Sequence, residues 1–251
     1  MSSVPDGVRA RLPVEDVLTA RELYRFYRAG EEETLALRGV SLKVRRGETV
    51  AVVGPSGSGK STLLSCLAGL DEPSGGEVCV HGVRISHRPE TERARLRARH
   101  IGVLLQARNL LPHLSVRDNI LLAQRASGRR AAVPWRELLG QVGLSARAHA
   151  LPRQLSGGEV ARAGLAVAVA NAPAVLLADE PTGELDGGTE QLVLTMLRDR
   201  AADGCAVLIV THSAEAVRIA DRVITLTDGR TGGTSTVDTR PEREEDRHAL
   251  G

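Results

Sequence analysis

The chain has 251 residues, of which 42% are hydrophobic and 25% are charged, and its formal net charge at pH 7 is +2. That apolar fraction suffices for a sizeable buried core, so the composition excludes a largely disordered chain. The small net charge excludes a protein that attracts nucleic acid through its overall charge. Length and composition together predict one large or two small α/β domains.

Apolar segments that span a bilayer need roughly 20 residues. The longest apolar stretches of this chain, 163–170 and 174–178, are much shorter. Residues 1–13 carry no apolar segment behind a basic start, which is the mark of a secretory signal. We therefore expect a cytoplasmic protein that does not itself cross a membrane.

The cysteines are three in number, widely spaced and set among apolar neighbours: Cys66, Cys79 and Cys205. An odd number of scattered cysteines is unsuited to a disulfide framework or to a cysteine metal site. We expect reduced thiols in the core.

The first elements along the chain are two strands. Residues 1–17 are expected to form a flexible lead. Apolar residues at alternating positions then predict strands over 18–25 and 35–44. The segment Gly30–Glu33 predicts a turn between these strands.

A strand, a glycine-rich loop and a helix follow. Residues 49–53 are a short apolar run, and 61–70 form an apolar-rich helical pattern that Asp71–Pro73 stops. Further short runs rich in β-branched residues or leucine predict strands over 78–80, 101–105, 175–178, 206–210 and 223–226. Such strands, mostly separated by longer helical patterns, usually lie in a sheet covered by helices.

The domain organisation predicted from these elements is simple. One domain covers residues 18–237 and contains a mainly helical subdomain over about 107–170, with Ser115 as a helix N-cap. A polar tail follows over 238–251. The basic run 93–100 is interpreted as the solvated face of a helix.

The glycine-rich loop matches the pattern G-x-x-x-x-G-K-[ST] after a strand and before a helix. Chance supplies this pattern in roughly one chain in a hundred of this length. Its glycines let successive amides surround phosphates, while a lysine reaches the β- and γ-phosphates and a serine hydroxyl coordinates Mg²⁺. The alternative is a glycine-rich turn that binds nothing. The predicted nucleotide-binding residues are Gly54, Pro55, Ser56, Gly57, Ser58, Gly59, Lys60, Ser61 and Thr62.

Two carboxylates leave the predicted sheet where the strand over 175–178 ends. The carboxyl ends of strands are where α/β proteins place ligands. Asp179 is suited to the Mg²⁺ shell and Glu180 to polarising the attacking water, because hydrolysis needs in-line positioning. The alternative, that the pair only caps the next loop, is weakened by the phosphate-binding loop upstream.

With Leu-Ser-Gly-Gly-Glu at 155–159, about twenty residues before that strand, the chain resembles the ATP-binding subunits of ABC transporters. The match runs over residues 18–230. The run Ala178–Asp186 and the connection from Tyr27 to Leu35 resemble the lipoprotein-releasing, macrolide-export and cell-division subgroup. The resemblance implies a P-loop NTPase fold: an ABC-type nucleotide-binding domain with a mixed sheet core, an antiparallel β part and a helical subdomain.

The segment 155–159 resembles the family signature and also has a physical sense of its own. It places Ser156, Gly157 and Gly158 at the expected start of a helix. That helix, expected over 159–170, would offer a hydroxyl and unhindered amides as a second anion-binding end. If this end lies far from the glycine-rich loop, as the family fold implies, two copies packed head to tail would share two ATP molecules. The alternative is a serine-capped helix after a loop.

Four further positions are carried over from the family one at a time. Tyr27 resembles the aromatic residue that stacks on adenine, with Tyr24 as a rival and core packing as the alternative. Gln106 resembles the residue that contacts Mg²⁺ and senses the helical subdomain. Asp186 resembles the dimer-contact aspartate, and His212 resembles the switch histidine that reaches the γ-phosphate. A lone histidine after a strand is, however, often only a polar loop residue.

The chain departs from the family pattern at five positions. Val160 and Ala161 replace the polar pair that is usual after the signature. Val167 stands where an arginine is common, and Ser213 follows the histidine where an aspartate is usual. Arg108 stands where an aromatic residue is common, near the expected contact with membrane partners. None removes a group from the predicted reaction, but Arg108 leaves the partner's identity open.

The main hypothesis is an ABC transporter ATPase subunit that uses ATP and Mg²⁺ and pairs with a second copy of itself. It would drive a separately encoded integral membrane permease in export or mechanical transmission, and so lie on the inner face of the plasma membrane. One alternative is a regulatory ABC ATPase that controls assembly of a membrane complex, as in cell division. Another, a DNA-repair or chromosome ATPase, lacks the expected coiled coil, zinc ligands or basic surface, so no nucleic-acid partner is expected.

Overall fold

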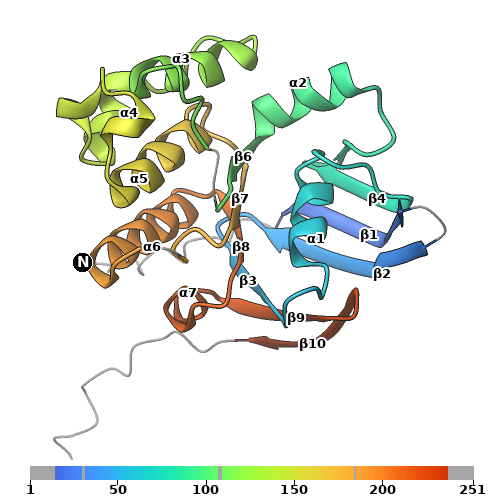
Figure 1. The fold of residues 1–251 in the computed structure, drawn as a ribbon. Coiled ribbons are helices and arrows are strands. Elements are labelled where there is room, and N and C mark those ends of the chain that lie inside the picture. Colours follow the sequence, from blue (N-terminus) through green and yellow to red (C-terminus); the bar gives the residue numbers. More distant parts are fainter. Residues whose placement is uncertain (1–14, 30–31, 107–108, 184, 237–251) are drawn as a thin grey trace, which may run out of the picture.

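The computed structural model describes residues 15–29, 32–106, 109–183 and 185–236. In these ranges the strands form two sheets (Figure 1). The smaller sheet is antiparallel in the order β2–β1–β4–β5, with bounds β1 (Asp16–Ala29), β2 (Glu32–Arg45), β4 (Gly75–Val80) and β5 (Val83–Arg84).

The larger sheet is mixed, in the order β10–β9–β3–β8–β7–β6. Its strands are β3 (Thr49–Val53), β6 (Ile101–Leu104), β7 (Val175–Asp179), β8 (Ala206–Val210), β9 (Arg222–Thr227) and β10 (Arg230–Thr236). All pairings are parallel except that of β10 with β9. The prediction of a mixed sheet core beside an antiparallel part is therefore confirmed.

The larger sheet is buried on both faces, by a different hydrophobic core on each side. Leu177 and Leu208 belong to the core that contains α1 (Lys60–Leu67), which lies between the two sheets (Figure 1). Leu176 belongs to the opposite core, which contains α6 (Gly187–Ala202). Burial on both sides explains why β7 and β8 read as continuous apolar runs rather than alternating ones.

The segment between β6 and β7 is mainly helical and lies beside the larger sheet, above α6 in Figure 1. Its helices are α3 (Val116–Ala126), α4 (Trp135–Gln141) and α5 (Gly157–Ala168), with 3₁₀ turns at Ser145–Arg147 and Pro152–Gln154. Ser115 caps α3 as predicted, because its hydroxyl accepts a 3.1 Å hydrogen bond from the Asp118 amide. The predicted subdomain bounds of 107–170 stay a prediction.

Two further helices complete the described part of the chain. The basic run 93–100 lies in α2 (Glu90–His100), which has no buried residue, but within this run only Arg95 is exposed and the other residues are half-buried. The short helix α7 (Ala214–Arg218) follows β8 and begins at a Ser213 cap. None of the helices in the described ranges has both the length and the apolar composition needed to span a membrane.

The connection between β1 and β2 is shorter than predicted. β1 continues to Ala29 and β2 begins at Glu32, so Glu32 and Glu33 lie in a strand and not in a turn. The Arg28 guanidinium pairs with the Glu33 carboxylate across the two strands at 3.2 Å. Such a cross-strand ion pair stabilises this polar end of the hairpin. The lead over 1–14, the tail over 237–251 and Arg108 lie outside the described residues.

Burial keeps the cysteine thiols protonated. Burial raises the pKa of Cys66 to about 12, and burial also raises the pKa of Cys205 to about 12. Since only the thiolate reacts, about one such thiol in 10⁴ is reactive at pH 8. We expect iodoacetamide at pH 8 to leave Cys66 and Cys205 unmodified in the folded protein and to modify both in denaturant, as measured by peptide mass. Rapid modification of Cys66 in the folded chain would contradict the described burial.

Candidate functional site

The glycine-rich loop between β3 and α1 passes through backbone conformations that favour glycine. Gly57 and Gly59 have φ angles of 78° and 99°. At Gly59 a Cβ atom would also come within 2.5 Å of the Ala36 carbonyl oxygen, so neighbouring β2 excludes a side chain there. The loop therefore depends on these glycines for its shape. That shape leads into the first turn of α1, whose unpaired amides favour an anion.

The Lys60 ammonium is held inside this loop. The residue is only 7% exposed, and Nζ donates hydrogen bonds to the carbonyl oxygens of Gly54 at 2.8 Å and Pro55 at 2.9 Å. An ammonium has three donors, so one is left for a ligand. The loop's own backbone therefore positions the predicted phosphate-binding charge.

Asp179 ends β7 next to the start of α1. Burial raises the pKa of its carboxyl group, and the nearby Glu180 charge acts in the same direction. The Ser61 hydroxyl and the Lys60 charge oppose that rise. A carboxylate beside a hydroxyl is an oxygen donor pair of the kind that Mg²⁺ prefers. The residues present therefore fit the predicted metal.

Glu180 stands in the left-handed backbone region, with a φ of 45°, which is uncommon for a residue other than glycine. Its amide donates to the Val210 carbonyl oxygen at 2.9 Å, and its carboxylate accepts hydrogen bonds from the His212 amide at 3.2 Å and the Thr211 hydroxyl at 3.4 Å. The His212 Nε2 atom lies 3.6 Å from Glu180 Oε1. Left-handed conformations cost about 1–3 kcal/mol and persist where the surroundings impose them, often at functional sites.

One cavity, of about 690 Å³, collects eight of the predicted residues from loops that are far apart in the sequence. Its lining contains Ser56, Gly57, Lys60, Ser61, Gln106, Asp179, Glu180 and His212. These residues lie at the carboxyl ends of β3, β6, β7 and β8, the edge where parallel sheets place ligands. The structure thus brings together the predicted phosphate, metal and catalytic residues.

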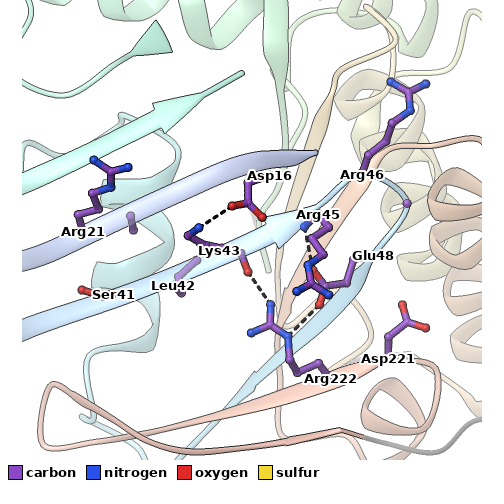
Figure 2. Close-up of a pocket in the computed structure, with 12 residues that line it drawn as sticks. Asp16, Arg21, Ser41, Leu42, Lys43, Arg45, Arg46, Glu48, Asp221 and Arg222 are labelled. Atoms are coloured by element: carbon purple, nitrogen blue, oxygen red, sulfur yellow. Dashed lines mark hydrogen bonds and ion pairs between the residues drawn. The ribbon is translucent and has the colours of Figure 1, made fainter. Parts of the chain in front are cut away.

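A larger hollow of about 1020 Å³ lies at the opposite end of β3 and contains none of the predicted site residues (Figure 2). Four of its charged side chains form two ion pairs within the lining. Lys43 Nζ lies 2.7 Å from Asp16 Oδ2, and Arg222 Nε lies 2.8 Å from Glu48 Oε1. The larger hollow therefore lacks the predicted site residues, and the smaller cavity contains the groups suited to phosphate chemistry.

The signature segment forms the capped helix start that the sequence predicts. The Ser156 hydroxyl accepts a hydrogen bond from the Glu159 amide at 3.2 Å, and the Glu159 carboxylate accepts one from the Ser156 amide at 2.9 Å. This reciprocal capping box holds α5, which begins at Gly157 and not at Glu159 as predicted. The bond from the Ser156 amide, followed by that from Arg147, holds the pKa of Glu159 below its usual value.

The signature residues do not line the cavity that contains Lys60. Gly157 lines a neighbouring hollow of about 340 Å³, together with Gln106 and Glu180. A Cβ atom at Gly158 would come within 2.7 Å of Thr189 in α6, so that glycine is required by the packing of the protein itself. In a single copy, therefore, the serine-capped helix start and the phosphate-binding loop are not parts of one cavity.

Asp186 caps the start of α6. Its carboxylate accepts hydrogen bonds from the Thr189 amide at 3.0 Å and from the Thr189 hydroxyl at 2.8 Å. These bonds hold the pKa of Asp186 below its usual value. The geometry accounts for this aspartate within one copy, and its role in a dimer contact stays a prediction.

The structure distinguishes between the two tyrosines of β1. Tyr27 lines a hollow of about 390 Å³ that also contains Gly57, Lys60 and Thr62 of the glycine-rich loop. Tyr24 is not part of that lining and lies against Gly75 in the neighbouring strand. Of these two candidates, Tyr27 is the one placed beside the phosphate-binding loop.

Two cavity residues were missed by sequence reasoning. The Glu190 carboxylate accepts hydrogen bonds from the Ser213 hydroxyl at 2.7 Å and from the Thr182 hydroxyl at 3.0 Å. Glu190 and Thr182 thereby tie the loop after Glu180 to the loop that carries His212. The partners are 8 and 23 residues apart in the sequence, so no local pattern could have linked them. Ser213, noted as a departure from the family pattern, makes the hydrogen bond that spans 23 residues of sequence.

Comparison with known protein families identifies the family of the chain. Residues 37–183 match the family described as ABC transporter. The macrolide export ATP-binding/permease protein MacB 2 of Aeromonas hydrophila subsp. hydrophila is 42% identical over 219 residues, which are 86% of this chain and 34% of that protein. This chain therefore spans about a third of that relative. The lipoprotein-releasing system ATP-binding protein LolD 1 of Rhodospirillum rubrum is 42% identical over 210 residues, which are 82% of this chain and 93% of that protein.

Solved structures agree with the sequence relatives. A dimeric structure of MJ0796, a bacterial ABC transporter cassette, superposes with a TM-score of 0.81 at 33% identity, over 89% of this chain and 99% of that one. A post-hydrolysis state of the same cassette, bound to ADP and Pi, gives the same TM-score and identity. The family match, the relatives and the shared fold lead to one conclusion: the chain belongs to the ABC transporter family, as an ATP-binding cassette of the ATPase type.

Proposed function

We propose that this chain binds and hydrolyses Mg-ATP as one half of a head-to-tail pair of copies, and that the pair powers a separately encoded integral membrane permease. The observation that carries the proposal is the cavity that gathers Lys60, Glu180 and His212 but not the helix start at Ser156. A triphosphate on the loop of one copy would leave a side free for the helix start of the other.

In this proposal the glycine-rich loop and α1 hold the triphosphate. Amides of the loop and of the first turn of α1 surround the phosphate oxygens, and Lys60 adds a positive charge to them. Ser61, Asp179 and Gln106 supply the oxygen atoms that would hold Mg²⁺. The metal would supply positive charge that neutralises the β- and γ-phosphate oxygens. Tyr27 would stack on the nucleobase in the adjoining hollow.

Glu180 is the proposed base for hydrolysis. Its carboxylate is only 18% exposed and is oriented by the His212 amide and the Thr211 hydroxyl. Held in this way, it can accept a proton from the attacking water as the bond to the γ-phosphate forms. The His212 side chain is 55% exposed beside it and would contact the γ-phosphate.

The second half of each ATP site would come from the α5 start of the other copy. Gly157 is the informative residue, because a Cβ atom there would meet no atom of the described residues within 4 Å. The described part of the chain gives no packing reason for glycine at this position. A phosphate of ATP held by a second copy would supply one, through close contact with the exposed amides of the helix start. Asp186 would contact the partner near the same place.

We expect Gly157→Asp to abolish ATP-dependent pairing, because the new carboxylate would repel the incoming triphosphate. The variant should still fold, since aspartate in the first turn of a helix is favourable. Light scattering of a Glu180→Gln background with Mg-ATP should show pairs, and the double variant should show single copies. Its unfolding temperature without nucleotide should change by only about 2 °C.

A matched control for this prediction is Gly233→Asp on β10. A Cβ atom at Gly233 also meets no atom of the described residues within 4 Å, but the position lies outside the site. This control should pair as the Glu180→Gln background does. Pairing that survives Gly157→Asp would count against a role for the signature helix in the shared site.

We infer the permease partner from relatives whose names refer to macrolide export and to lipoprotein release, and the cargo of this chain is open. One relative carries its permease in the same protein, whereas the lipoprotein-releasing relative is an ATP-binding protein of similar length. We expect this chain to act like the second kind, on the cytoplasmic face of the plasma membrane. Copurification of an integral membrane protein whose reconstitution raises ATP turnover in vesicles would support this. A protein that hydrolyses ATP fully without any membrane partner would refute it.

A further inference from the structure

Three side chains on one side of Tyr27 form a closed set of contacts. Arg25 Nε and Nη2 donate to the two carboxylate oxygens of Asp71 at 2.9 and 2.7 Å. The Tyr27 hydroxyl donates to Asp71 Oδ2 at 2.7 Å. The Arg25 guanidinium carbon also lies 4.5 Å from the centroid of the Tyr27 ring. The ring is thus fixed at its hydroxyl end and along one face.

Local structure explains why these residues meet. Arg25 and Tyr27 both lie on β1, and their side chains meet on one side of the strand because both contact Asp71. Asp71 follows α1, and the apolar residues of α1 belong to the core between the two sheets. The strand and the helix end are therefore both anchored, and the contact between them links β1 to the element that begins with the phosphate-binding loop.

Burial makes the set more rigid than an ordinary surface ion pair. The Arg25 and Asp71 side chains are 23% and 25% exposed. Burial by itself would raise the pKa of Asp71, but hydrogen bonds from Tyr27 and Arg25 outweigh it and hold the pKa below its usual value. A bidentate arginine–carboxylate pair has a fixed geometry that lysine cannot reproduce. Asp71 thereby serves as an ionised anchor for both neighbours.

Tyr27 also borders the hollow in which the proposed nucleotide would place its base. Tyr27 lines the hollow beside the glycine-rich loop, and neither Arg25 nor Asp71 belongs to that lining. The pair therefore supports the ring from outside the hollow. A triphosphate on Gly57–Ser61 would place its nucleobase in this space, since the same hollow contains Lys60.

We propose that Arg25 and Asp71 are positioning residues that hold the Tyr27 ring as a ready-made platform for the nucleobase. The inference rests on the proposed ATP site and adds two residues to it. An exposed tyrosine near the end of a hairpin would otherwise lose its freedom of movement when ATP binds, and this loss would weaken binding. The pair acts on the base of ATP and not on its phosphates.

The test compares a ligand that has a base with one that lacks it. Binding of Mg-ATP and of Mg-tripolyphosphate is measured by calorimetry on the full chain and on Arg25→Ala and Asp71→Asn. Each variant should weaken ATP binding about three- to tenfold and leave tripolyphosphate binding unchanged. In turnover assays the KM for ATP should rise by a similar factor, while kcat at saturating ATP stays the same.

Two further variants make the test specific. Arg21→Ala removes an arginine of the same strand that is 70% exposed and pairs with Glu77, so this variant should bind both ligands normally. Tyr27→Phe keeps the ring and removes only its bond to Asp71, so it should weaken ATP binding in the same direction even if Arg25→Ala fails to fold.

The outcomes separate this inference from the proposed function. Equal weakening of ATP and tripolyphosphate by Arg25→Ala would show a general structural role and overturn the inference. Unchanged ATP binding in Tyr27→Phe and in the foldable pair variants would also overturn it. Failure of the unaltered chain to bind either ligand would instead refute the proposed nucleotide site.

Discussion

The Glu180→Gln variant is expected to lose ATP turnover by about 10² to 10⁴, the usual contribution of a positioned general base. Glutamine keeps the size of the side chain and can still accept the hydrogen bonds from the His212 amide and the Thr211 hydroxyl. It cannot take up a proton from water. The chemical step should therefore fail while ATP binding and pairing survive, and the paired state should become longer-lived.

Release of inorganic phosphate at saturating Mg-ATP measures this effect. The control is Glu215→Gln on α7, a carboxylate that is 42% exposed and pairs with Arg218 outside the cavity. This control should turn over ATP as the unaltered chain does. Turnover within about threefold of normal in Glu180→Gln would remove Glu180 from the role of base.

Lys60→Ala is expected to produce the second large effect, loss of nucleotide binding. Charge-assisted hydrogen bonds contribute about 1.5–3 kcal/mol each, so removal of the ammonium should weaken Mg-ATP binding by roughly 10- to 150-fold. The Gly54 and Pro55 carbonyl oxygens would also lose their donor, which would loosen the loop that cradles the phosphates. Both effects act in the same direction.

The chain offers a matched control, because Lys43 is the only other lysine in its sequence. Lys43 pairs with Asp16 at 2.7 Å at the opposite end of β3 (Figure 2). Calorimetric titration with Mg-ATP should show normal binding for Lys43→Ala and greatly weakened binding for Lys60→Ala. Tight ATP binding by Lys60→Ala, together with normal hydrolysis, would refute the assignment of the phosphate site.

The strands and the phosphate loop were predictable because their signals are local. Residues 206–210 were predicted as a strand and form β8, since five successive apolar residues are buried on two faces of the sheet. Gly57, Gly59 and Lys60 act through backbone conformation and chemistry that belong to their own segment. Such segments reveal their role without knowledge of what packs against them.

The choice between Tyr24 and Tyr27 could not be made from alternation along the strand. The pairing of β1 with β2 shifts register between Leu23 and Tyr24 and again between Arg25 and Phe26. Each irregularity changes which side chains share a face, so counting by twos fails there. The hairpin bounds were wrong in the same region, where the charged residues Glu32 and Glu33 extend β2 through cross-strand pairing.

Contacts between distant segments were also beyond sequence reasoning. The pairing of Arg25 with Asp71 joins residues 46 positions apart, and that of Ser213 with Glu190 joins residues 23 positions apart. Nothing in either segment marks its partner, because the contact exists only once the sheets and helices have assembled. The supporting residues of a site are for this reason harder to predict than its glycines and lysine.

The most direct test of the shared ATP site is complementation between two inactive copies. One copy carries Lys60→Ala and the other carries Gly157→Asp, and both also carry Glu180→Gln so that pairs persist. Neither copy should pair with itself in Mg-ATP. In an equal mixture about half of random encounters join unlike copies, each pair having one intact loop facing one intact helix start. Light scattering should then show ATP-dependent pairs in the mixture alone. If the mixture shows only single copies in Mg-ATP while the Glu180→Gln chain forms pairs, the result would contradict a site built from two copies.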